Sequence, residues 1–176
     1  MPQLIKGSLT EGGRVADDIW TVIDSEDELQ AAPGHAPLLV VLPVWQAHRE
    51  ALAARGVCLG VQLEPGDDPA ALADDLQQLA LVAIAFPKFT DGRGYSIARL
   101  LRERYGYRGE IRAVGDVLRD QIYYMLRSGF DAFVLKDGAS ITDALSAYAD
   151  FSEAYQTSLE RPIPLFRRRA SEPRPA

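Results

Sequence analysis

LVAIAFPKFTDGRGYSIARLL, residues 81–101, places an unbroken apolar run, a polar loop and an amphipathic stretch in direct succession. The run 81–86 is typical of a strand buried on both faces of a sheet. Residues 95–105 carry apolar side chains at helical spacing. The stretch therefore predicts a strand, a loop at its carboxyl end, and a helix.

The same succession of an apolar run and an amphipathic stretch repeats in both directions along the chain. Apolar runs that predict strands are 37–42, 57–63, 81–86, 110–114 and 131–135. Patterns that predict helices are 44–55, 70–79, 95–105, 117–128 and 141–156. Alternation of this kind predicts a parallel sheet with right-handed crossovers. We expect an α/β fold with a mainly parallel five-stranded sheet flanked by helices. An open, doubly wound sheet fits the length, and a partial TIM-barrel-like sheet is the alternative.

The repeated units define one domain over residues 1–158. Residues 1–30 predict a short β-rich segment, and the repeated βα units occupy 36–157. The tail 159–176 is rich in Arg and Pro, which predicts a disordered basic tail. A basic docking tail is the alternative interpretation.

Composition narrows the class of protein. The chain has 176 residues, a net charge of −6 and 47% hydrophobic residues, as in ordinary globular proteins. An acidic chain is not suited to broad binding of nucleic acid or of anionic membranes. No apolar run reaches the length of a membrane span, and the first residues lack the apolar centre of a signal peptide. We therefore expect a cytoplasmic protein.

Metal-binding residues are few. Cys58 is the only cysteine, and it lies in an apolar run that predicts a buried, unreactive thiol. The only histidines, His35 and His48, have no partner at metal-ligand spacing. We expect neither a resident metal nor an iron–sulfur cluster.

The loop after the run 81–86 is the first candidate site, because ligands of parallel α/β sheets bind beyond the carboxyl ends of strands. Gly92 and Gly94 allow close approach of the backbone to a ligand, and a helix N-terminus follows. The candidate ligand-binding residues are Lys88, Thr90, Gly92, Arg93, Gly94, Ser96 and Arg119. Together they predict a small-anion site. The glycine spacing fits neither a P-loop nor a Rossmann dinucleotide motif, because Ile97 stands where a third small residue is needed.

Two carboxylates are the catalytic candidates. Asp91 lies in the loop, and Asp116 follows the next strand, where it is placed to cap a helix starting at Val117. Acid–base chemistry requires that one substrate reach both groups. Structural interpretations stay open for the whole loop: Asp91 and Thr90 as helix caps, the glycines as turn residues, or the loop as a docking surface for a partner.

Three motifs carry a family resemblance: DDIW (17–20), FPKFTDGRGYSIARLLRERYGYRGEIRAVGDVLRDQ (86–121) and GFDAF (129–133). With them the chain closely resembles an uncharacterised bacterial family, the domain of unknown function numbered 934. Proteins of this family are described as oxidoreductases linked to assimilatory sulfite reduction. The resemblance implies a role in the pathway of assimilatory sulfite reduction. It assigns no catalytic residues and no cofactor to this chain.

Two hypotheses follow. The first is an accessory protein or oxidoreductase of sulfite reduction that binds the reductase, its electron donor or an anionic ligand. The second is a small α/β enzyme on an anionic substrate held by Lys88 and Arg93, with Asp91 or Asp116 in acid–base catalysis. The residues leave open whether the chain is an enzyme.

Overall fold

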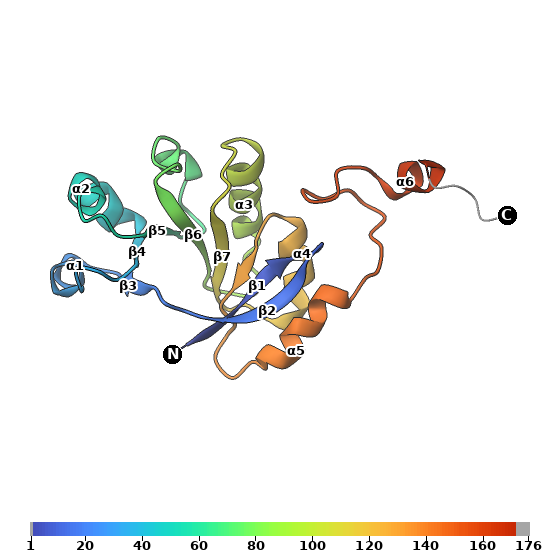
Figure 1. Ribbon diagram of the computed structural model, residues 1–176, viewed down its shortest axis with the longest axis horizontal. Coiled ribbons are helices and arrows are strands. Elements are labelled where there is room, and N and C mark those ends of the chain that lie inside the picture. The colour runs from blue at the N-terminus through green and yellow to red at the C-terminus, as the bar shows by residue number, and fades with distance from the viewer. Residues whose placement is uncertain (1, 172–176) are drawn as a thin grey trace.

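A single curled sheet organises the protein (Figure 1). The computed structural model describes residues 2–171. The strands of this part are β1 (Gln3–Ser8), β2 (Gly12–Asp17), β3 (Thr21–Ile23), β4 (Leu38–Val41), β5 (Leu59–Leu63), β6 (Leu79–Phe86), β7 (Glu110–Gly115) and β8 (Ala132–Phe133). Their order across the sheet is β2-β1-β8-β7-β6-β5-β4-β3.

Strands β3 to β8 are parallel and lie side by side in chain order. A doubly wound sheet reverses its strand order at a switch point, and this sheet does not. Sequential order instead belongs to barrels, in which every crossover puts its helix on the same side. The expectation of a five-stranded, doubly wound sheet was therefore wrong, and the partial barrel fits.

Three strands near the N-terminus, the hairpin β1–β2 and the strand β3, account for the difference between the five strands expected and the eight found. The predicted β-rich segment forms the antiparallel hairpin β1–β2, and β1 also pairs antiparallel with β8. Since β3 adds a sixth parallel strand at the other edge, the sheet is mixed and has eight strands.

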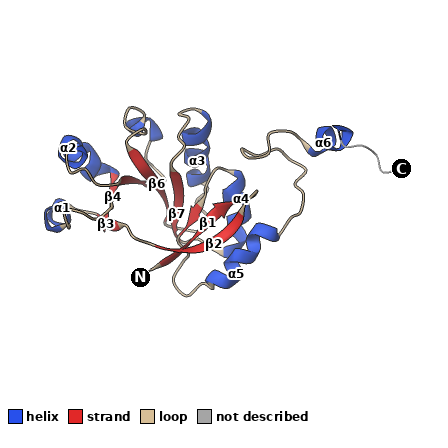
Figure 2. Cartoon of the chain, in the orientation of Figure 1, coloured by secondary structure: helices blue, strands red, loops and turns tan. Residues whose placement is uncertain are grey.

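Helices follow one another along the outer side of the half-barrel (Figures 1 and 2). The α-helices are α1 (Glu26–Ala31), α2 (Leu42–Ala53), α3 (Arg93–Glu103), α4 (Arg119–Arg127), α5 (Ile141–Leu145) and α6 (Leu165–Ser171). Two 3₁₀ helices join them, η1 (Pro69–Leu72) and η2 (Ser146–Ala149). The main core lies between this layer and the sheet, where Val82, Ile84 and Phe86 of β6 are fully buried.

The inner face of the sheet has its own small apolar cluster. Leu39, Leu81 and Ala83 lie on this face, and Trp20 packs against them. Residues 17–20, which we call the strap, run from β2 to β3 across the inner face (Figure 1). The strap contains the DDIW motif, so this motif closes the inner face of the half-barrel.

Asp18 fixes the strap to the sheet. Its carboxylate accepts a hydrogen bond from Nη1 of Arg112 at 2.9 Å, and Arg112 is only 1% exposed. Arg112 also pairs with Glu110, which in turn pairs with Lys6 of β1. A buried guanidinium is stable only when it is paired in this way.

The predicted helix 70–79 is mostly absent. Asp68 does cap a helix with Pro69 at its first position, but only the short η1 forms. Asp75 turns inward, where it accepts a hydrogen bond from the Trp45 indole at 3.1 Å and pairs with Arg49. Leu79 already belongs to β6. Tertiary contacts have therefore overridden a favourable helical pattern.

The predicted helix 117–128 begins later than expected, and Asp116 does not cap it. Leu118 occupies the N-cap position of α4, because Val117 continues the extended chain and accepts a hydrogen bond from the Lys136 N–H. The predicted helix 141–156 ends at Ala149, although Ser140 caps its start as expected. The tail from residue 159 carries α6, and residues 172–176 lie outside the described part.

Candidate functional site

The carboxyl ends of β6, β7 and β8 are neighbours, and the loops that follow them meet at one edge of the sheet. Asp116 links all three. Its carboxylate pairs with Lys136 Nζ at 2.8 Å and accepts a hydrogen bond from the Phe89 N–H at 3.1 Å. The hydrogen bond from Lys136 lowers the pKa of Asp116, and the Phe89 N–H acts in the same direction. Asp116 is thus an ionised group that holds the loop in place.

Asp91 forms a closed pair with Arg93 inside the loop. The guanidinium donates from Nε at 3.0 Å and from Nη2 at 2.7 Å, and the Arg93 backbone N–H donates to the same carboxylate at 3.2 Å. These hydrogen bonds lower the pKa of Asp91 from 3.8 to about 2. A carboxylate held in this way stays ionised and is a weak base near neutral pH.

The two glycines of the loop have different surroundings. A Cβ at Gly94 would come within 2.6 Å of the Phe86 ring and 3.1 Å of Ile84, so glycine is needed for α3 to pack on β6. A Cβ at Gly92 would meet nothing within 4 Å, and its backbone is in the ordinary right-handed region. Gly94 therefore serves packing, and only Gly92 leaves open space for a ligand beside the backbone.

The remaining predicted ligand-binding residues divide into two groups. Lys88, Thr90 and Ser96 are exposed on the loop and the first turn of α3, and Lys88 lies near enough to Asp91 to lower its pKa. Arg119 points elsewhere: it forms a bidentate pair with Asp150 and donates to Ser146 Oγ. Asp91 and Asp116 share no hydrogen-bond partner among residues 2–171. The structure thus brings Lys88, Asp91 and Arg93 together and directs Arg119 to η2 and its C-cap residue.

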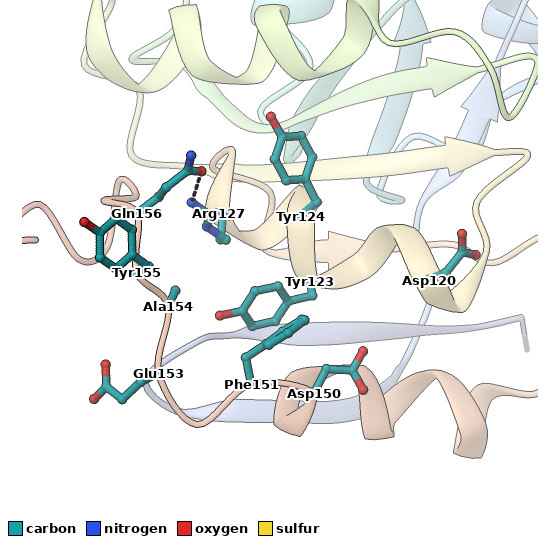
Figure 3. A pocket seen from close by; sticks show the side chains of 10 residues that line it. All are labelled: Asp120, Tyr123, Tyr124, Arg127, Asp150, Phe151, Glu153, Ala154, Tyr155 and Gln156. Atoms are coloured by element: carbon teal, nitrogen blue, oxygen red, sulfur yellow. Dashed lines mark hydrogen bonds between the residues drawn. The ribbon is translucent and has the colours of Figure 1, made fainter. Parts of the chain in front are cut away.

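A groove with a volume of about 550 Å³ lies on another part of the surface, between α4 and the segment 150–156 (Figure 3). We call it the aromatic groove. Its lining residues are Asp120, Tyr123, Tyr124, Arg127, Asp150, Phe151, Glu153, Ala154, Tyr155 and Gln156. The ring centroids of Tyr123 and Phe151 are 4.7 Å apart, with the ring planes tilted by 51°. Phe151 is 60% exposed and Tyr155 is 74% exposed.

Sequence reasoning missed this groove. The sequence pattern places Phe151 and Tyr155 on a long helix, 141–156, which would separate them from Tyr123. The helix ends early, so Phe151 lies beside Tyr123 and the chain continues along α4 as an irregular segment. The signal available in the sequence was the number of aromatic residues near the end of a helical pattern.

Among residues 2–171, no three His, Cys, Asp or Glu side chains are grouped so that they could hold a metal ion. None of the helices described is long and apolar enough to cross a membrane. Cys58, expected to be buried, is exposed, because it precedes β5 and its side chain does not enter the core.

These features define a class: an α/β half-barrel with a tightly paired loop at the carboxyl edge of its sheet and an aromatic groove beside α4. A family model described as "Bacterial protein of unknown function (DUF934)" matches residues 60–166. The chain belongs to this family. No curated protein matches it.

Proposed function

We propose that this protein is a cytoplasmic accessory protein of assimilatory sulfite reduction that acts by binding another protein at the aromatic groove. The observation that carries the proposal is the cluster of exposed aromatic side chains beside Arg127. Tyr, Phe and Arg are enriched at the centres of protein interfaces, and exposed apolar patches mark such sites. The pathway is supported by the resemblance carried by residues 17–20, 86–121 and 129–133.

The proposed partner is sulfite reductase or the protein that supplies its electrons. An accessory role requires no redox centre in this chain, because the partner supplies that chemistry. If the chain is itself an oxidoreductase, the aromatic groove is the surface at which it meets the donor or the acceptor.

The test is a binding measurement between the purified chain and purified sulfite reductase, repeated with the electron donor. Phe151→Ala should weaken binding by about tenfold or more, since truncation of an interface hot spot costs about 2 kcal/mol or more and every 1.4 kcal/mol is tenfold. Phe89→Ala is the matched control, because Phe89 is also exposed but lies on the carboxyl-edge loop. If Phe89→Ala weakens binding and Phe151→Ala does not, the docking surface is the loop.

Growth supplies a second readout. A strain that lacks the protein should grow poorly on sulfate or sulfite and normally on sulfide or cysteine. Equal growth on all four sulfur sources, together with no binding to either protein, would remove the proposal.

A second candidate function is an enzyme for a small anionic substrate at the carboxyl edge. The observation that favours it is Lys88, an exposed cation with no ion-pair partner in the part of the chain described, next to the open backbone at Gly92. Sulfite, sulfate, phosphate or a nucleotide at about 100 times its dissociation constant should add about 2.7 kcal/mol to the free energy of unfolding. Lys88→Ala should abolish this gain in the free energy of unfolding. Asp116→Asn should abolish turnover of the anion that binds.

A further inference from the structure

The C-terminal segment leaves the α/β body after η2 and ends in α6. In Figure 1, α6 lies well away from the sheet, on the side of the segment away from α4. The hydrogen bonds of its Arg168 side chain go to Ile163 O and Ala154 O, and the ion pair goes to Glu153. We call residues 161–171 the arm. Glu153 and Ala154 also line the aromatic groove, so these contacts place the arm at the rim of the groove.

The arm is anchored to the body at its base. Glu160 accepts a hydrogen bond from the Leu9 N–H at 2.9 Å, and Leu159 lies against Gly129. Arg127 donates to Thr157 O and to Gln156, which tightens the chain before the anchor. The base therefore fixes the direction in which the arm projects from the body.

The arm exposes apolar side chains that a free helix would not keep in water. Phe166 is 61% exposed and Ile163 is 55% exposed. Helix α6 has seven residues, and isolated helices shorter than about 12–15 residues are marginal in water. Packing of Phe166 and Ile163 on another surface would stabilise the arm.

Charge identifies the kind of surface. The arm, residues 161–171, contains four arginines and no acidic residue, a net charge of +4, and the whole stretch 159–176 has a net charge of +3. The remaining residues, 1–158, contain 14 basic and 23 acidic residues, a net charge of −9. A basic arm is thus attracted to an acidic body, including that of another copy.

The aromatic groove has the matching chemistry. Tyr123, Phe151 and Tyr155 provide the apolar lining, and Asp120 at its edge has no ion pair within residues 2–171. The chain's own arm reaches the rim of the groove, where Arg168 pairs with Glu153 and donates to Ala154 O, but no residue of the arm is among those that line the groove. One chain therefore carries both an arm with exposed apolar and basic side chains and a groove with exposed aromatic rings and the Asp120 carboxylate.

We propose that the arm of one copy binds in the aromatic groove of a second copy. Phe166 and Ile163 pack on Tyr123, Phe151 and Tyr155, and Arg167 approaches Asp120. When both arms exchange, the two contacts are related by a twofold axis and the assembly closes as a dimer. The inference rests on the groove as a protein-docking site, which the proposed function also uses, so a second copy and a partner protein compete for it.

The experiment is sedimentation velocity of the full chain over a wide range of concentration and at two salt concentrations. We expect a dimer that dissociates on dilution and weakens at high salt, because part of the attraction is between charges. Phe166→Ser in the arm and Phe151→Ala in the groove should each weaken dimerisation by about tenfold or more. Phe89→Ala, an exposed aromatic residue outside both surfaces, should leave it unchanged.

Mixing the two variants tests the pairing of arm with groove. A Phe166→Ser chain keeps its groove and a Phe151→Ala chain keeps its arm, so the mixture should form one arm–groove contact. The mixture should therefore associate more tightly than either variant alone, while an arm–arm or groove–groove contact would show no such rescue. Both residues are exposed, so unchanged melting temperatures should confirm intact folds.

Three outcomes would overturn the inference: a full chain that stays monomeric at every concentration, a dimer that survives both substitutions, or no rescue on mixing. None of these outcomes bears on sulfite reductase, because only this chain is present. Conversely, failure to bind the reductase leaves the dimer result intact, so the two proposals fail separately.

Discussion

Two aspartates of this protein have opposite pKa shifts because their surroundings differ. Asp91 is half-buried and accepts three hydrogen bonds from Arg93, which lower its pKa to about 2. Desolvation of the carboxylate raises the pKa of Asp131 to about 6, although the side chain is still 38% exposed, and the Arg102 guanidinium at 2.7 Å only partly opposes this effect. Pairing dominates at the first residue, and loss of water dominates at the second.

The Asp91 carboxylate should titrate near pH 2 when followed by NMR. In Arg93→Ala the midpoint should rise toward the ordinary value of about 3.9. Because the folded-state pKa is lowered, the stabilisation from this pair is complete above the unfolded pKa and is lost as pH falls toward 2. A midpoint near 4 in the unsubstituted chain would show that Arg93 does not hold this carboxylate in solution.

Asp131 should give the opposite pH dependence. Between about pH 3.9, where an unfolded aspartate titrates, and pH 6, the folded chain binds more protons than the unfolded chain. The contribution of Asp131 to the free energy of unfolding should therefore decrease as pH rises through this window. Denaturant unfolding at several pH values should show this slope, and Asp131→Asn should remove it. A slope that persists in the variant would assign it to other groups, among them Glu160, whose pKa burial also raises.

At the scale of elements, Gly94 sets how closely the first turn of α3 approaches β6. Gly94→Ala should cost about 1–3 kcal/mol of unfolding free energy, because the new methyl group enters the space of the Phe86 ring. Gly92→Ala is the matched control two residues away, and it should be neutral or stabilising by about 0.4–1 kcal/mol. Thermal unfolding of the two variants checks the pair. Equal losses would mean that the loop glycines serve the turn and not the packing.

The strands of the parallel sheet could be predicted from sequence because each is a short, continuous apolar run. LVAIAF, residues 81–86, lies within β6, and the runs before and after it also became strands. Strand order could not be read in this way, since a doubly wound sheet and a half-barrel use the same local pattern. The difference depends on which edge each new strand joins, and no local residue determines that.

The helices were predicted less well where tertiary contacts compete with propensity. Helical structure stops at Leu72, and the Asp75 carboxylate instead accepts from Trp45 and pairs with Arg49. The carboxyl-edge loop was located correctly beside α3, yet the Asp91–Arg93 pair and the Asp116–Lys136 pair depend on side-chain directions that spacing does not show. The aromatic groove required knowledge of where the last helices end.

At the scale of the whole molecule, Arg112 joins the strap to the sheet. Arg112→Ala should cost about 3–5 kcal/mol, since removal of one partner leaves the Asp18 carboxylate unpaired on the inner face. The emission of Trp20 should shift to longer wavelength as the strap loosens. Arg108→Ala, at an exposed arginine, is the control and should change stability by less than about 0.5 kcal/mol. A small loss in Arg112→Ala would show that apolar packing of Trp20 alone holds the strap.

The pairing of β1 with β8 has a consequence for synthesis of the chain. Ile5 leaves the ribosome early, but its partner Phe133 is made only after most of the chain. At ordinary elongation rates the delay is on the order of 10 s. During that interval the hairpin β1–β2 has a strand edge without its partner, and such edges invite association between nascent chains. The parallel strands β3 to β8 lie in chain order, so each can pair with the strand before it as it leaves the ribosome. The pairing of β1 with β8 is therefore the last strand pairing of the sheet to form during synthesis.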